Sequence, residues 1–313
     1  MNIGDGDVRP PSLRVAASIK CRRMSKRPIP DVHAQPCNVG VFLSETPPPG
    51  LTASYESASR KQVCVEFLIV CPLALIAGMV DAVAGGGGLI SLPAFIFAGL
   101  PVHNAIATNK LASTMGTTLA TIRYALSGYM VKRFVVAGVV CGLSGSTLGS
   151  NLALMTDDGA FKAIMLVILP FVAFFVLRTK NLDAFANREL PRGRALAITA
   201  AAAFLIGIYD GFYGPGTGTF LMLALTALAH QDVRTAAGTT KAINLSTNAA
   251  ALAVFIANGA VLFPLGLAAG AFNIVGNWIG SSSFMKRGSS IARPVMLVVI
   301  VLFAARLVFD LFA

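Results

Sequence analysis

The chain has 313 residues, of which 55% are hydrophobic and only 12% charged, and its formal net charge is +11. A soluble domain carries roughly 25% charged residues, so this composition argues against an ordinary soluble fold. In a soluble protein the positive charge would suggest nucleic acid binding, whereas in a membrane protein it is expected in the cytoplasmic loops. We therefore expect no nucleic acid partner.

The first segment of the chain, residues 1–62, differs in composition from everything that follows. It contains half of the 16 prolines, and basic residues cluster between Lys20 and Arg27. No apolar stretch follows these charges closely, as it would in a secretory signal peptide. The segment is typical of a disordered, basic tail. A translation start assigned too far upstream would give the same pattern.

Apolar stretches long enough to cross a bilayer recur from residue 63 onward. The clearest are residues 63–84, 134–155, 160–177, 194–213, 263–285 and 291–313. Helices that are apolar on every side cannot all be buried in a soluble core. The sequence therefore predicts an all-α, multi-pass helical bundle in the cell (inner) membrane, in contact with the lipid bilayer.

The apolar part of the chain repeats itself. The segment GMVDAVAGGGG at 78–88 returns as GIYDGFYGPGT at 207–217, and ATNK at 107–110 returns as GTTK at 238–241. Repeats of this kind are common in transporters. We expect two related halves, residues 63–182 and 183–313, with about five apolar segments each.

The second segment of each half is short. Residues 89–100 and 217–229 would reach only about 18–20 Å as helices, against a hydrocarbon core of about 30 Å. If these short or re-entrant helices cross, the halves are inverted; if they turn back, each half has four spans and the repeats are parallel. Ten crossings put the basic loops at 132–133, 178–194 and 286–293 on one side, so we favour inverted halves. This choice places the basic tail on the opposite side.

Two aspartates, Asp81 and Asp210, occupy matching places near the ends of apolar spans. A carboxylate at membrane depth costs several kcal/mol unless it has a partner, a cavity or a proton. Both are candidates for proton coupling. Each could instead sit at the interface and cap the short helix that follows.

Two lysines, Lys110 and Lys241, also match, and small polar residues such as Asn109 and Thr240 precede them. They could provide positive charge for an anion, or they could extend to the membrane interface. Backbone amides at the start of each short helix would favour the same anion; these belong to Gly86, Gly87, Gly216 and Thr217. Close helix packing is the alternative for these glycines.

The later glycines, between 138 and 149 and between 266 and 280, are better interpreted as helix-packing positions. Arg123 has no charged counterpart in the second half, so it could contact the solute or pair with Asp81. The three histidines show no metal-ligand spacing, and no nucleophile elbow, HExxH motif or Walker A loop is present. We expect no enzyme activity, no metal and no cofactor.

The block DAVAGGGGLISLP at 81–93, the Gly99–Pro101 turn and ATNK at 107–110, with a weaker copy from Asp210, resemble the sulfite exporter TauE/SafE family of membrane permeases. The resemblance extends over residues 63–313. It implies a secondary transporter that moves small anions such as sulfite, sulfonates or related organic anions, with export coupled to the proton gradient by alternating access. An anion channel, or a membrane assembly factor without transport, are the alternatives. The residues alone predict a pseudo-symmetric anion site, but not sulfur chemistry and not the oligomeric state.

Overall fold

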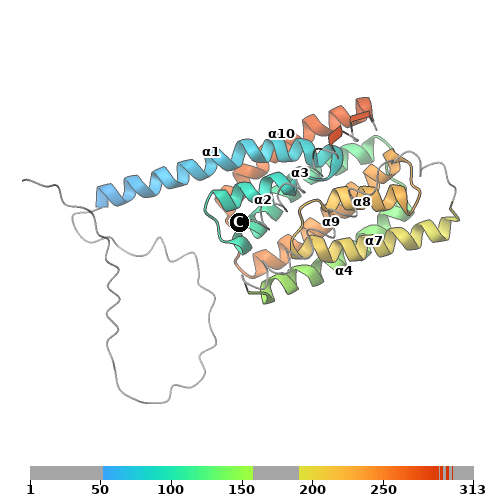
Figure 1. Cartoon of the computed structure of the whole chain (residues 1–313), viewed down its shortest axis with the longest axis horizontal. Coiled ribbons are helices and arrows are strands. Elements are labelled where there is room, and N and C mark those ends of the chain that lie inside the picture. The colour runs from blue at the N-terminus through green and yellow to red at the C-terminus, as the bar shows by residue number, and fades with distance from the viewer. Residues whose placement is uncertain (1–51, 158–189, 289, 292–293, 296–297, 299–313) are drawn as a thin grey trace, which may run out of the picture. The chain divides into compact units, whose positions relative to one another are not determined.

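The computed structural model describes residues 52–157, 190–288, 290–291, 294–295 and 298, and the regular elements in these ranges are all α-helices. The predicted all-α bundle is thus confirmed (Figure 1). The helices are α1 (Thr52–Ala84), α2 (Gly88–Phe97), α3 (Val102–Leu126), α4 (Lys132–Met155), α7 (Arg192–Phe212), α8 (Thr217–Ala227), α9 (Val233–Ala257) and α10 (Phe263–Arg287).

Within the described residues, three helices are long and apolar enough to cross a membrane: residues 66–84 of α1, α4 and α7. The predicted spans at 63–84, 134–155, 194–213 and 263–285 correspond to α1, α4, α7 and α10. The predicted span at 160–177, and most of the one at 291–313, lie outside the described residues. The number of crossings therefore stays a prediction.

The structure begins α1 at Thr52, inside the segment predicted to be a tail. Residues 52–62 contain neither proline nor glycine, so nothing in them stops a helix from extending ahead of the apolar span. The rest of the predicted tail, residues 1–51, lies outside the described residues.

Helices α2 and α8 are short, as predicted, with 10 and 11 residues. At 1.5 Å per residue they reach only about 15–17 Å. A glycine with positive φ precedes each of them: φ is 73° at Gly85 and 98° at Gly214. Only glycine adopts this conformation without a steric cost, which explains why both motifs place a glycine four residues after the aspartate.

Helix α4 of the first half packs closely on α7, the first helix of the second half. A Cβ atom on Gly145 would overlap the carbonyl oxygen of Phe204, and one on Gly149 would overlap that of Ile208. Contacts at this distance require glycine, so these glycines serve helix packing, as predicted.

Helix α10 packs on α1 in the equivalent way. A Cβ atom on Gly276 would overlap the carbonyl oxygen of Leu75, and one on Gly280 would overlap that of Met79. Each half therefore places its fourth segment on the first helix of the other half, and in both interfaces the two helices run parallel.

The central helices of the two halves, α3 and α9, run antiparallel. Lys110 of α3 lies beside Asn248 of α9, and Thr121 lies beside Lys241. Figure 1 shows α1 and α7 running in opposite directions as well. In these two pairs, helices related by the sequence repeat thus have opposite directions. Inverted halves would require this geometry, and they stay a prediction.

One end of the bundle is basic. The ring of Tyr129, just after α3, contacts Arg234 at the start of α9 and Phe284 near the end of α10. Because α4 and α7 run parallel, their first residues lie at this end too. The described basic residues at this end, which include members of all three predicted basic loops, are Lys132, Arg133, Arg192, Arg194, Arg234, Lys286 and Arg287.

Candidate functional site

Two buried ion pairs connect the halves. The Nζ atom of Lys110 lies 2.8 Å from Oδ1 of Asp210, and the Nζ atom of Lys241 lies 2.9 Å from Oδ2 of Asp81. Each lysine therefore pairs with the aspartate of the other half. Four charges at this depth would be very costly alone, and the crossed pairs balance them.

The helices explain why the pairs cross. Asp81 and Asp210 stand in the last turns of α1 and α7, while the lysines lie in the first third of α3 and α9. Because α3 and α9 run antiparallel, Lys110 lies beside Asn248, two turns beyond Lys241. The two pairs are thus separated by about 10 Å along the helix axes.

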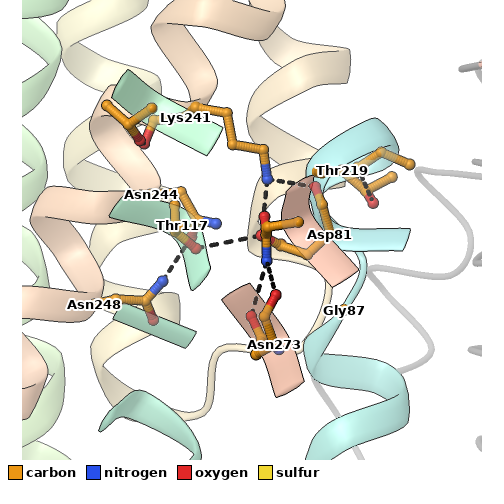
Figure 2. A network of polar contacts seen from close by, with 12 residues as sticks. Asp81, Gly87, Thr117, Thr219, Lys241, Asn244, Asn248 and Asn273 are labelled. Carbon is orange, nitrogen blue, oxygen red and sulfur yellow. Dashed lines mark hydrogen bonds and ion pairs between the residues drawn. The ribbon is translucent and has the colours of Figure 1, made fainter. Parts of the chain in front are cut away.

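The Asp81 pair has two further hydrogen bonds (Figure 2). Thr117 of α3 donates through Oγ1 to Oδ2 of Asp81 at 3.3 Å. Lys241 also donates to the backbone carbonyl of Asp81, so its amine binds both the side chain and the helix end. The Asp81 side chain keeps 12% of its surface exposed.

The Asp210 pair has different partners. Thr217, the first residue of α8, donates to Oδ1 of Asp210 at 2.8 Å. Lys110 also donates to Oδ1 of Asn248 at 3.0 Å, and Asn248 donates to Asn244 at 3.2 Å. The second carboxylate oxygen of Asp210, Oδ2, is buried and has no hydrogen-bond partner among the described residues.

The other predicted solute-binding residues lie close to these pairs in sequence. Asn109 and Thr240 precede the lysines and are buried, and Asn109 Oδ1 and Thr240 Oγ1 have no hydrogen-bond partner in the described part of the chain. Gly86 and Gly87 are buried, and a Cβ atom on Gly87 would press on Asp81. Gly216 precedes α8 with a φ of 84°.

The two glycine-rich turns meet each other. The backbones of Gly85 and Gly218 are so close that neither position has room for a Cβ atom, and Gly88 lies against Pro215. A Cβ atom on Gly214 would lie 2.8 Å from the amine of Lys110. Close packing therefore accounts for part of the glycine pattern, and Gly214 leaves room for the lysine.

Two members of the site were missed, in whole or in part, by sequence reasoning. Thr117, which binds Asp81, was not singled out, and neither was the contact of Asn248 with Lys110 of the other half. Both lie seven residues after a motif lysine, which puts them on the same helix face two turns later. That spacing was the signal available in the sequence.

Arg123 does not take the predicted place beside Asp81, whose ion-pair partner is Lys241. Its guanidinium donates to the carbonyl of Trp278 at 2.7 Å and lies 5.9 Å from the centre of that indole ring. A further buried network was not predicted: Asn277 donates to Asn273, which donates to the carbonyl of Ala74 in α1. It lies next to the Asp81 pair (Figure 2).

Among the described residues, no group of three His, Cys, Asp or Glu side chains could hold a metal ion. The site consists instead of two Lys–Asp pairs surrounded by hydroxyl and amide groups.

Apolar helices, two short helices after glycine turns and paired charges buried between two halves are typical of a membrane protein of the permease class. The chain belongs to the sulfite exporter TauE/SafE family, whose pattern matches residues 70–307. It is 35% identical to the "Probable membrane transporter protein ORF9" of Sinorhizobium sp, over 78% of this chain and 92% of that protein.

Other relatives have similar names. A "Probable membrane transporter protein" of Haemophilus influenzae is 30% identical, over 75% of this chain and 91% of the relative. The "Probable membrane transporter protein YfcA" of Escherichia coli K12 is 29% identical, over 76% of this chain and 88% of the relative. No solved structure matches the chain.

Proposed function

We propose that the protein is a secondary transporter of small anions and that the crossed ion pairs form its binding and coupling site. The observation that supports this most is the reciprocal pairing of Lys110 with Asp210 and of Lys241 with Asp81. Each half supplies the charge that the other half needs. A movement of one half against the other, as in alternating access, would therefore act on contacts that these pairs make.

The solute would bind by replacing a carboxylate on a lysine. Lys110 and Lys241 supply the charge, and Asn109 and Thr240 supply polar groups whose oxygen atoms have no partner in the described part. The amides of Gly86, Gly87, Gly216 and Thr217, at the starts of α2 and α8, add the positive ends of two helix dipoles. Sulfite and sulfonates fit this chemistry, and the family description is the reason to test them first.

Charge balance determines the coupling. An empty site with closed ion pairs is neutral, and so is a site that holds one anion and one proton on an aspartate. A site that holds an anion without a proton carries a net negative charge, which is costly within the bilayer. Proton and anion therefore move together, with Asp81 or Asp210 as the proton acceptor. An inward proton gradient then favours uptake, so export requires a higher anion concentration inside, unlike the proton-driven export expected from the family.

The test is transport into liposomes that contain the purified protein, with labelled sulfite, methanesulfonate and acetate as solutes. The double variant Lys110→Gln, Lys241→Gln removes both buried charges, and Lys132→Gln, Arg133→Gln removes two basic residues at the end of the bundle. Loss of charge-assisted hydrogen bonds of about 1.5–3 kcal/mol predicts a flux about 10- to 100-fold lower in the first variant. The control variant keeps its flux.

Normal flux in a folded Lys110→Gln, Lys241→Gln protein would exclude the binding role. Flux of none of the three anions through the wild type would refute the small-anion proposal. Accumulation of an anion against its own gradient, driven by a pH difference, separates the transporter from an anion channel, which only equilibrates the solute.

A further inference from the structure

We infer that the two ion pairs have different tasks: Asp210 accepts the coupling proton and its pair with Lys110 opens, while the pair of Asp81 with Lys241 stays closed and holds the halves together. This rests on the proposed transport function and names which carboxylate does the coupling. The sequence motifs are symmetric and do not distinguish the two.

The end of α1 is fixed by three other helices. The last carbonyls of a helix lack partners within it, although that of Asp81 accepts from the backbone N–H of Gly85 at 2.8 Å. Side chains of α9, α3 and α8 bind them: Lys241 donates to Asp81, Tyr124 to Ala82 at 2.7 Å and Thr219 to Ala84 at 2.8 Å. Opening the Asp81 pair would break two bonds of the Lys241 amine, one to the carboxylate and one to the carbonyl, while Tyr124 and Thr219 hold the end of α1 in place.

The equivalent turn after α7 is braced mainly by its own residues. Tyr209 donates to the carbonyl of Pro215 at 2.6 Å, and the backbone N–H of Thr217 donates to that of Gly214 at 3.2 Å. The turn is thus a rigid unit within the second half. It is connected to the first half by the ion pair with Lys110 and by the close contact of Gly218 with Gly85. Opening that pair leaves the local bonds of the turn intact.

The carboxylates also differ in how well their charge is stabilised. Asp210 receives Lys110 and Thr217 on Oδ1, whereas Oδ2 is buried without a partner in the described region and the side chain is only 2% exposed. Asp81 is 12% exposed, so its side chain is less completely enclosed than that of Asp210. An ionised oxygen that is buried without a donor is costly, and a proton removes that cost.

The step is balanced in charge and atoms. A proton from water binds Oδ2 of Asp210 and makes the carboxyl group neutral. The amine of Lys110 then leaves Oδ1 while it keeps its hydrogen bond to Asn248, and it binds the incoming anion. Release of the anion and the proton on the other side restores the ion pair.

The groups around Asp210 allow this reaction. Lys110 of α3 is the charged partner shown at this carboxylate, and the hydroxyl group that binds it is that of Thr217 on α8. Tyr209 precedes Asp210 on α7, and the backbone of Ser146 and Ser150 on α4 lies beside the neighbouring Gly211. Tyr209 is already bound to a carbonyl, and a tyrosine does not titrate near neutral pH.

Infrared difference spectroscopy of the protein in liposomes, on acidification alone, tests the inference without any solute. The measured signal is the C=O band of the carboxyl group that becomes protonated first as the pH falls. This band should be present in the wild type and in Asp81→Asn, and absent in Asp210→Asn. Asp157→Asn, which changes an exposed carboxylate just after α4, is the matched control and should keep the band. Thermal unfolding of each variant verifies the fold and should show the larger loss for Asp81→Asn.

The inference would be overturned if the band disappeared in Asp81→Asn, alone or together with Asp210→Asn. It would also be overturned if the band remained in both variants or were missing from the wild type. So would equal losses of thermal stability in the two variants. These outcomes are separate from the flux of the lysine double variant. A protein with lysine-dependent transport whose first proton binds Asp81 would still be the proposed transporter, with the tasks of the pairs exchanged.

Discussion

The crossed pairing makes a prediction about which variants compensate each other. Lys241→Met removes a buried charge while nearly keeping the length of the side chain. It leaves Asp81 with one side-chain donor, Thr117, in a position that is 12% exposed. Removing one partner of a buried ion pair costs about 3–5 kcal/mol, because the remaining charge has no counterion. Because the Asp81 side chain is partly exposed, we expect a loss at the lower end, about 3 kcal/mol.

The second substitution distinguishes crossed pairs from pairs within one half. Adding Asp81→Asn removes the unpaired charge and should recover most of the lost stability, because a neutral replacement of a whole buried pair is often close to neutral in free energy. Adding Asp210→Asn instead should cost about 3–5 kcal/mol more, because it leaves Lys110 unpaired as well. Relative to Lys241→Met, the first double variant should thus be more stable and the second less stable.

Unfolding in mixed micelles by increasing sodium dodecyl sulfate, followed by circular dichroism, measures these free energies. Lys132→Met, at the basic end of the bundle, is the control and should change stability by less than about 0.5 kcal/mol. Two results would show that the crossed pairs do not exist in the folded protein. One is that adding Asp210→Asn restores the stability lost in Lys241→Met; the other is that the free-energy changes of all the substitutions are additive.

Three further outcomes can be measured on the same preparation. Gly145→Ala should cost about 1–3 kcal/mol because its methyl group overlaps a carbonyl of α7, whereas Gly193→Ala, with open space around it, should be neutral or gain up to about 1 kcal/mol. Tyr124→Phe should cost about 1–3 kcal/mol, since it leaves a carbonyl at the end of α1 without its donor. Gly214→Ala should reduce transport, because its Cβ atom would meet the amine of Lys110 at a position with a φ of 98°.

The sequence was sufficient for features that are encoded locally. Helices α2 and α8 could be predicted because a glycine-rich turn and a second turn bracket each apolar run. The packing role of the later glycines followed from their spacing of about one helix turn. The importance of Asp81, Asp210 and the two lysines followed from their cost in an apolar environment and from their repetition.

The pairing itself could not be predicted, for a physical reason. A repeat shows which residues are equivalent, whereas contact depends on how the helices cross. The residues on the same face of the helix as Lys110 all belong to its own half. Nothing in the sequence places Asp210 of the other half beside it. The antiparallel arrangement of α3 and α9 decides the partner, and it results from packing over the whole bundle. The prediction that Arg123 could pair with Asp81 failed because Lys241 already occupies that carboxylate.

The exchange of partners between the halves links folding to function. Either half alone would leave one lysine and one aspartate unpaired in the bilayer. The glycines of α4 would also lose their packing partner α7, and those of α10 would lose α1. These costs favour a bundle in which both halves are present, so the stability of the protein depends on the same contacts that the solute must disturb. A site built in this way cannot bind an anion at one lysine without weakening the connection between the halves. We infer that the connection between Lys110 and Asp210 weakens first, because Asp210 keeps a buried oxygen without a hydrogen-bond partner among the described residues.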